Sequence, residues 1–170
     1  MAEKKLSLQT AAEEDAEFIC KMMLNKEYQK HYLERLLHKS VEEAKIKIRE
    51  SERDAKKGKG FFFIVLLGKK KIGVLDIYKI NSKDKRASIG YGIMNEEWGK
   101  GLGTKICALG VKYAKNNLKL HTLEATADPN NEASRKVLEK NGFVLLGTVK
   151  DYYFDRGKYT DRDLYWKVLE

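Results

Sequence analysis

The sequence contains few of the residues on which disulfide-bonded and metal-binding proteins rely. Its 170 residues include two cysteines and one proline. Cys20 and Cys107 lie far apart, lack metal-ligand spacing and are too few for a disulfide framework, so we expect two buried thiols and no metal site. The sequence also lacks internal repeats and proline-rich linkers. Together these absences predict a single domain over residues 1–170.

Long apolar runs are missing as well. No stretch approaches the roughly 18 continuous apolar residues of a membrane-spanning helix. The hydrophobic fraction of 42% is nevertheless too high for a disordered chain. Residues Met1 to Leu8 are a short polar lead into a strand, without the apolar core and cleavage site of a secretory signal. We therefore expect a cytoplasmic protein that has no membrane partner.

Basic residues outnumber acidic ones. The chain has 34 Lys and Arg against 25 Asp and Glu, which gives a net charge of +9. Such a charge favours an anionic ligand, which includes nucleic acid, an acidic membrane and a phosphorylated cofactor. Because acidic residues are interspersed along the chain, the charge equally fits an ordinary solvated surface. Charge alone therefore does not identify the ligand.

Hydrophobic patterning predicts a mixed, mostly antiparallel sheet of about seven strands with helices on both faces, an α+β (α/β) fold. The expected strands are Leu6 to Gln9, Phe61 to Leu67, Ile72 to Ile80, Ala87 to Met94, His121 to Ala127, Phe143 to Phe154 and Asp163 to Val168. The expected helices are Ala12 to Leu24, a stretch with Tyr28, Tyr32 and Leu36, a run opened by Ser40, a helix from Gly101, and Glu132 to Lys140. The strand, loop, helix and strand in the middle imply one parallel crossover.

A glycine loop separates a predicted strand from a predicted helix. It reads Trp98-Gly99-Lys100-Gly101-Leu102-Gly103-Thr104. The first turn of a helix has backbone N–H groups without partners, and glycine allows a phosphate to approach them closely. The loop is not a P-loop, because no Gly-Lys-Ser/Thr ends it, and it lacks the Rossmann spacing. It therefore predicts an anion site, although any tight strand-to-helix turn could use these glycines.

A second motif follows downstream, Asn131-Glu-Ala-Ser134-Arg-Lys-Val-Leu-Glu-Lys140-Asn-Gly142-Phe143. Together the two motifs resemble the GNAT superfamily of N-acetyltransferases, in its RimJ/RimL-like branch, which acetylates ribosomal-protein N-termini and polyamines. The resemblance covers Phe61 to Leu169 by motif, and the first sixty residues only by element order. It implies an acyltransferase that uses acetyl-CoA and no metal, on a sheet whose fourth and fifth strands splay apart.

The resemblance also implies a set of coenzyme-binding residues. The backbone near Ile93 and Met94 would meet the pantetheine, and Gly90 and Gly92 would suit either a bulge or the close approach of a ligand. Lys100 could add charge to the loop. The full set is Ile93, Met94, Trp98, Gly99, Lys100, Gly101, Leu102, Gly103, Thr104, Asn131 and Ser134.

Catalysis in this superfamily is a direct attack of a neutral amine on the thioester, which needs a base and a proton donor. Ser134 is the expected donor, since the tyrosine often used would fall at Leu138; equally, Ser134 could simply occupy a first helical turn capped by a neighbouring asparagine. A glutamate that this branch places in the sixth strand corresponds to Tyr153 here. An acidic residue that is common early in the fourth strand corresponds to Ser88. The candidate catalytic residues are Ser134, Asp76 and Tyr153.

Asp76 is the leading local candidate for binding or deprotonating the amine, because it is an acid within an apolar strand. A surface position that points to water is the alternative for Asp76, and Glu124 has the same status. The segment Asn25 to Lys39, with Tyr28, His31, Tyr32 and His38, is expected to border the acceptor site. A protein N-terminal amine, such as that of a ribosomal protein, is the first choice of acceptor, followed by a polyamine or a small amine.

Two alternative functions belong to other classes of protein: nucleic-acid binding and coenzyme binding without catalysis. The terminal residues Tyr152, Tyr153, Phe154, Arg156, Lys158 and Tyr159 could stack and bind nucleic acid, although alternating aromatics in terminal strands more often form core. The missing family acids would also fit a protein that binds coenzyme A without catalysis. The sequence does not decide whether the protein is a homodimer.

Overall fold

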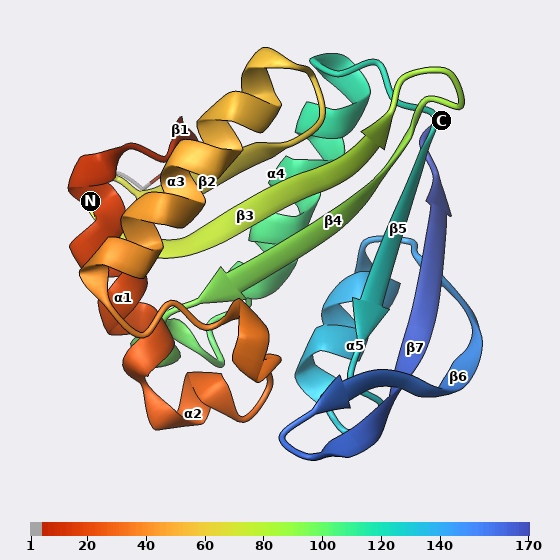
Figure 1. Cartoon of the computed structure of the whole chain (residues 1–170). Coiled ribbons are helices and arrows are strands. Elements are labelled where there is room, and N and C mark those ends of the chain that lie inside the picture. Colours follow the sequence, from red (N-terminus) through yellow and green to blue (C-terminus); the bar gives the residue numbers. More distant parts are fainter. Residues whose placement is uncertain (1–4) are drawn as a thin grey trace.

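The computed structural model describes residues 5–170, so the polar lead of residues 1–4 lies outside the described residues. Seven strands form one sheet in the order β1-β2-β3-β4-β5-β7-β6 (Figure 1). The strands are β1 Leu6–Thr10, β2 Phe61–Leu67, β3 Lys70–Asn81, β4 Arg86–Ile93, β5 Thr122–Ala127, β6 Val144–Asp155 and β7 Lys158–Val168. The helices are α1 Ala16–Leu24, α2 Lys26–Gln29, α3 Val41–Lys56, α4 Leu102–Asn116 and α5 Glu132–Lys140.

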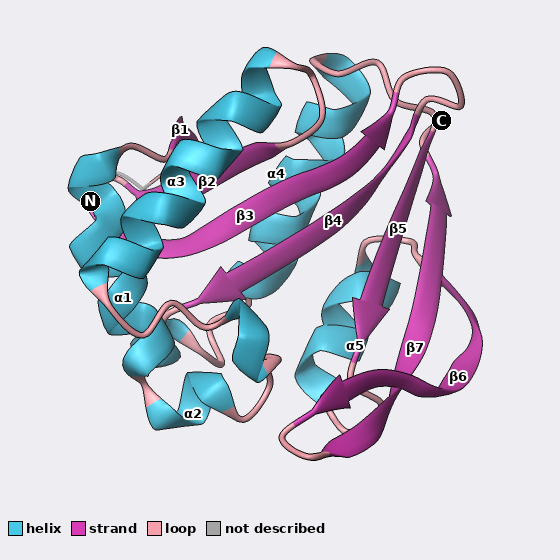
Figure 2. Ribbon diagram, viewed as in Figure 1, coloured by secondary structure: helices cyan, strands magenta, loops and turns pink. Residues whose placement is uncertain are grey.

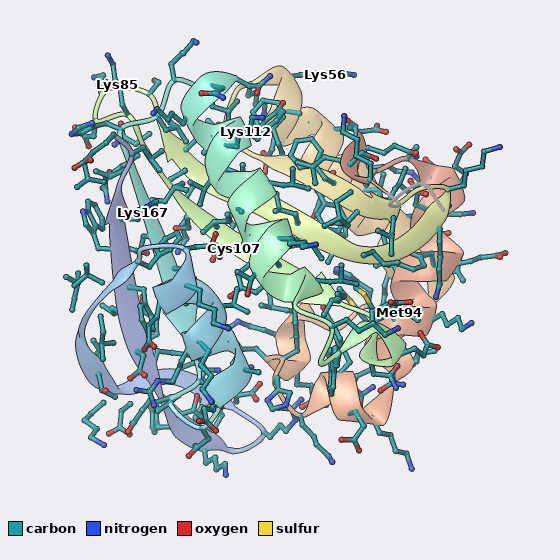
Figure 3. The ribbon with its side chains drawn as sticks, turned by 180° about the vertical axis from the view of Figure 1, so that it is seen from behind. Lys56, Lys85, Met94, Cys107, Lys112 and Lys167 are labelled. Carbon is teal, nitrogen blue, oxygen red and sulfur yellow. The ribbon has the colours of Figure 1, made fainter. Side chains whose placement is uncertain are left out.

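Helices cover both faces of the sheet, as predicted. On one face α1 and α3 enclose a core that includes Ile19, Ile48 and Ile64. On the other face α4 and α5 enclose a larger core around Leu75, Ile106 and other apolar side chains. Figure 3 views the molecule from behind, where α4 lies across this second face and carries the labelled Cys107. The sheet therefore has two separate apolar cores, one for each layer of helices.

The centre of the sheet has the predicted splay. β2, β3 and β4 form an antiparallel meander, whereas β4 and β5 are parallel, as the crossover requires. Their pairing is short, since it runs only from Arg86 opposite Thr122 to Ser88 opposite Glu124. Beyond these pairs the two strands diverge (Figure 1). The divergence leaves the later halves of β4 and β5 without each other as backbone partners.

The expected helix Ala12 to Leu24 is present, but its first turn is a 3-10 turn over Glu13–Asp15. The Asp15 carboxylate accepts the Ala12 N–H at 2.8 Å and is fully buried. Both cysteines are also buried, Cys20 on α1 and Cys107 on α4. Burial raises the pKa of the Cys107 thiol to about 12. This confirms the expectation of two buried thiols.

The expected helix through Tyr28, Tyr32 and Leu36 was wrong in its extent. The chain forms only α2 and a 3-10 turn at Glu34–Leu36, separated by loop (Figure 2). The cause is a tertiary contact with the β6–β7 hairpin. Arg156 Nη2 donates to the carbonyl oxygens of Gln29 and Tyr32 at 3.1 and 3.0 Å, and these are carbonyls that a continuous helix would use for itself.

Candidate active site

The glycine loop begins α4 in the conformation that its sequence requires. Gly99 and Gly101 have φ angles of 74° and 70°, in the left-handed region that favours glycine. A Cβ added to either glycine would meet no atom within 4 Å. Gly101 is the N-cap of α4 and no side chain of the described residues caps the helix, so its first N–H groups face open space. This donor set suits an anionic group such as a pyrophosphate.

Side chains on either side fix the loop in place. Trp98 Nε1 donates to the Ile93 carbonyl oxygen at 3.0 Å, which anchors the loop to the end of β4. Lys100 forms a 2.9 Å ion pair with Glu97, which also pairs with Lys70. These hydrogen bonds lower the pKa of the buried Glu97 carboxyl. Because Glu97 shares one negative charge between Lys70 and Lys100, the charge that the sequence suggested for Lys100 is balanced only in part.

A cavity of about 270 Å³, which we call the loop cavity, opens over the start of α4. It is bounded by the glycine loop, the end of β4, the α2 region and the first turns of α5. From the predicted coenzyme-binding set its lining includes Ile93, Trp98, Gly99, Gly101, Leu102, Gly103, Thr104, Asn131 and Ser134. Met94 and Lys100 do not line it; the Met94 N–H donates to Ile72, and its side chain packs in the α1–α3 core.

A second cavity of about 180 Å³, which we call the splay cavity, lies where β4 and β5 diverge. Its wall combines β4, β5, β6 and β7 with the loop after α2. It shares five residues with the loop cavity, namely His31, Tyr32, Tyr91, Asn131 and Ser134. The two cavities therefore adjoin at Ser134, and a ligand in one could reach a ligand in the other.

The capped helical turn expected around Ser134 is present, and the role of Ser134 as a proton donor stays a prediction. Ser134 sits in the first turn of α5, whose N-cap Asn131 accepts the Ser134 N–H at 3.1 Å. Its Oγ lies 3.3 Å from the Tyr91 hydroxyl, which also donates to the Ser134 carbonyl oxygen. Leu138, where the family tyrosine would fall, is almost fully buried. Tyr91 on β4 thus supplies a phenol beside Ser134, and the sequence reasoning did not find it.

Burial controls the protonation of this tyrosine. It raises the pKa of Tyr91 far above the ordinary value, although the Ser134 hydrogen bond acts in the other direction. The phenol therefore stays protonated at physiological pH and acts as a hydrogen-bond donor. Tyr91 could have been found from the sequence only as an aromatic between two glycines in a strand, a pattern that more often marks packing.

Two stacked tyrosines close the loop cavity on the α2 side. The rings of Tyr28 and Tyr32 are 4.4 Å apart, and Tyr32 donates to the Tyr91 carbonyl oxygen. A Cβ on Gly92 would lie 2.1 Å from the Tyr28 hydroxyl, so Gly92 makes room for this side chain. Burial raises the pKa of Tyr28 well above its ordinary value, and among residues 5–170 its hydroxyl has no hydrogen-bond partner.

The other catalytic candidates are dispersed. Asp76 faces α3, pairs with Lys47 at 3.1 Å and lines neither cavity. Glu124 lies opposite Ser88 and Trp166 in the sheet and also lines neither cavity. This placement does not support either acid as the partner of an amine. Lys47 also explains why an acid is tolerated in an apolar strand.

Tyr153, in contrast, lines the splay cavity. Its ring has the guanidinium groups of Arg35 and Arg162 at 4.5 and 5.2 Å from the ring centre. Phe154 and Tyr159 pair with each other and are 60% and 64% exposed, whereas Arg156 is tied to Asp155 and to the α2 region. The aromatic and basic residues that suggested nucleic acid are thus divided between a cavity wall and the hairpin tip.

The segment Asn25 to Lys39 borders both cavities, as expected, but through only part of its residues. Tyr28, His31 and Tyr32 line the cavities, whereas His38 does not and donates its N–H to Met23 Sδ at 3.2 Å. In residues 5–170 no three His, Cys, Asp or Glu side chains are placed to hold a metal ion. No helix in this part of the chain is both long and apolar enough to cross a membrane.

The fold and the glycine loop are those expected of a coenzyme-dependent acyltransferase. Comparison with known proteins identifies the family. Residues 5–144 match the Acetyltransferase (GNAT) domain. The chain therefore belongs to the GNAT acetyltransferase family, whose acyl donor is acetyl-coenzyme A.

The chain is 28% identical over 160 residues to the uncharacterized N-acetyltransferase p20 of Bacillus licheniformis. The match covers 93% of this chain and 89% of p20. It is 31% identical over 97 residues to the spermidine N(1)-acetyltransferase of Escherichia coli, covering 57% of this chain and 52% of that protein. It spans about half the length of several curated relatives that it matches.

Solved structures show the same fold. The ribosomal L7/L12 alpha-N-protein acetyltransferase RimL, in complex with coenzyme A, superimposes with a TM-score of 0.87. The two are 23% identical, and the match covers 99% of this chain and 97% of that one. At this identity the likeness establishes the shared fold, and the acceptor must be argued from the site itself.

Proposed function

We propose that the protein is an N-acetyltransferase that moves an acetyl group from acetyl-CoA to the α-amine at a protein N-terminus. The observation that carries this proposal is the meeting of two cavities at Ser134, one over a helix N-terminus with free donors and one in the splay of the sheet. One cavity suits a phosphorylated coenzyme and the other suits an acceptor. A protein amine is preferred because RimL, a structural neighbour, is named for an alpha-N-protein substrate.

The coenzyme would be held mainly by backbone. The N–H groups from Gly101 to Thr104 would bind its pyrophosphate, with the helix dipole adding to the attraction. When bound, acetyl-CoA supplies the acetyl group as an activated thioester. Ile93 and Ser134, which both line the loop cavity, would border the pantetheine arm. Gly103 allows close packing here, since a Cβ at this position would lie 3.3 Å from Val137 Cγ2.

The reaction forms a carbon–nitrogen bond and breaks a carbon–sulfur bond, so one proton leaves the amine and one reaches the sulfur. Ser134 Oγ would donate the second proton, and Tyr91, which gives its own hydroxyl proton to the Ser134 carbonyl oxygen, would accept from Ser134 Oγ and keep that hydroxyl oriented. His31 lines both cavities and is the side chain best placed to accept the amine proton, directly or through water. No covalent enzyme intermediate is needed.

An acceptor panel tests this function. The protein would be incubated with acetyl-CoA and a short peptide, spermidine or a small primary amine, while free thiol and product mass are followed. We expect thiol release with the peptide and modification at its α-amine, and no release from the same peptide with a blocked N-terminus and a free lysine. Spermidine as the better substrate would favour the polyamine alternative. Coenzyme binding without turnover of any amine would favour a non-catalytic protein.

A further inference from the structure

The splay cavity contains a buried arginine whose hydrogen-bonding capacity is mostly unused. Arg162 on β7 is only 7% exposed. Its Nη1 donates to the Asp161 carbonyl oxygen at 2.7 Å, and its nearest carboxylate oxygen, on Asp128, is 3.8 Å away. A guanidinium has five N–H donors in a planar fork. Arg162 lines the splay cavity, and none of its nitrogens is among the fully enclosed side-chain atoms of residues 5–170 that lack a hydrogen-bond partner, so its remaining donors are open to a ligand.

Two of the three carboxylates around Arg162 are paired with other cations. Asp128 is the third: its Oδ1 accepts the Asn130 N–H at 2.9 Å, and its Oδ2 is the oxygen 3.8 Å from Arg162. Asp155 pairs with Arg156 at 2.7 Å, and Asp161 pairs with Lys150 at 2.6 Å. These three acids line the splay cavity or the outer groove that continues it past His31 and Tyr32. A cationic acceptor would therefore find few free carboxylates, whereas an anionic group would find an arginine.

We propose that the splay cavity recognises a carboxylate close to the reacting amine of the acceptor, and that Arg162 binds this carboxylate. The inference rests on the proposed function, because it assigns the acceptor to this cavity. Arg162 lines both the splay cavity and the outer groove, whereas Ser134 lines the splay cavity and not the groove. The planar fork of arginine matches a carboxylate with two parallel hydrogen bonds. The acceptor is thus an amine with an acidic neighbour rather than a polyamine.

Matched acceptors test the inference. Three peptides would begin with Ser-Asp, Ser-Asn or Ser-Lys and be otherwise identical, and β-alanine would be compared with its amide to distinguish a small amino acid from a peptide. We expect kcat/KM for Ser-Asp to exceed that for Ser-Asn by about tenfold or more, with Ser-Lys the poorest. If the acid-dependent gain occurs with β-alanine alone, the acceptor is a small molecule and the carboxylate site stands.

Two variants assign the preference to Arg162. In Arg162→Gln the ratio of kcat/KM for Ser-Asp to kcat/KM for Ser-Asn should fall to about one; Arg162→Lys should keep part of the ratio. Arg35→Gln is the matched control, because Arg35 also stacks on Tyr153 but does not line the cavity. It should keep the full ratio. A thermal unfolding curve with coenzyme A bound confirms that each variant is folded.

Peptide binding to the coenzyme A complex, measured by calorimetry, separates this inference from the proposed function. Binding that depends on the acid and on Arg162, without turnover, would overturn the proposed function and keep the carboxylate site. Turnover without a preference for Ser-Asp, or a preference that survives in Arg162→Gln, would overturn the inference and keep the function. Absence of both binding and turnover with every acceptor would overturn both.

Discussion

The loop cavity and the splay cavity are built from different parts of the chain. The binding surface at the start of α4 is a continuous backbone segment, with two left-handed glycines and no side-chain cap within the described residues. The splay cavity is made of side chains such as Tyr78, Tyr153 and Arg162, brought together by the sheet. Backbone donors offer the same chemistry whatever the side chains, so the first surface suits a constant ligand. The side-chain surface of the splay cavity can be altered by single substitutions, so it suits a ligand that is specific to one protein.

Ser134 belongs to both cavities, and its removal should have the largest effect. Because a positioned proton donor contributes on the order of 10²-fold or more, Ser134→Ala should lower kcat by about 10²-fold. The coenzyme dissociation constant should change less than about twofold, since the loop cavity is otherwise intact. Steady-state kinetics and calorimetry measure the two quantities. An unchanged kcat would remove Ser134 from the mechanism and leave it as a residue of a capped helical turn.

Two further variants place the reacting sulfur relative to Ser134. Tyr91→Phe removes the hydroxyl 3.3 Å from Ser134 Oγ and should lower kcat less than Ser134→Ala does. Ser134→Cys should form a mixed disulfide with coenzyme A when treated with coenzyme A disulfide, which mass spectrometry detects. Glu132→Cys, two residues earlier and outside the cavity lining, is the control. Equal modification of both variants would argue against a sulfur next to Ser134.

Replacing Gly101 should weaken coenzyme binding and lower stability but leave the chemical step unchanged. The αL conformation costs an alanine roughly 1–2 kcal/mol, so Gly101→Ala should lower the free energy of unfolding by about that amount. Because Gly101 lines the loop cavity, the added methyl group would also occupy space beside the start of α4, so we expect coenzyme A to bind about tenfold more weakly. The kcat at saturating coenzyme should change little. Calorimetry and denaturant unfolding provide the two measurements.

Gly58 provides the matched control for this substitution. It follows α3, has a φ of 65° and, like Gly101, has open space where a Cβ would lie. Gly58→Ala should therefore show a similar loss of stability without loss of coenzyme affinity. Similar affinities in the two variants would mean that the α4 terminus does not hold the coenzyme, and the contrast between the two cavities would fail.

The same contrast explains what could be predicted from the sequence. The glycine loop and the capping of α5 by a neighbouring asparagine depend on residues close together in the chain, so local patterns identified them. The mostly antiparallel sheet and its one parallel crossover were also predicted, because a strand, a helix and a strand in succession restrict the topology. The assignment to a family then required only two local motifs in the correct order.

The missed features depend on contacts between distant residues. The turn after Tyr28 is set by Arg156, which lies more than 120 residues away in sequence. Tyr91 and Arg162 gain their roles only from Ser134 and from the cavity between the diverging strands. Asp76 was selected because it is an acid within an apolar strand, yet the neighbour that explains it, Lys47, comes from a separate helix. No spacing in the sequence indicates these pairs.

Asp76 lines neither cavity, and its replacement should therefore have the smallest effect. Asp76→Asn should leave kcat/KM within about twofold of the original protein, because Asp76 contacts Lys47 on the α3 side of the sheet. The free energy of unfolding at neutral pH should change by no more than about 1 kcal/mol, which is usual for a partly exposed ion pair. A large loss of activity in a fully stable variant would instead identify Asp76 as the base.

The pH dependence of stability gives a second measure of Asp76. Burial raises its pKa above the ordinary value of 3.8, and this outweighs the opposing effect of Lys47. A raised pKa in the folded state means that the carboxyl contributes most to stability below the unfolded pKa, and that this contribution is lost as pH rises through the folded value. The stability of the original protein relative to Asp76→Asn should thus decline as pH rises from about 4. In the Lys47→Gln background, where the opposing charge is gone, this decline should be larger. If the stability difference caused by Asp76→Asn does not change with pH in either background, Asp76 titrates as it does in the unfolded chain.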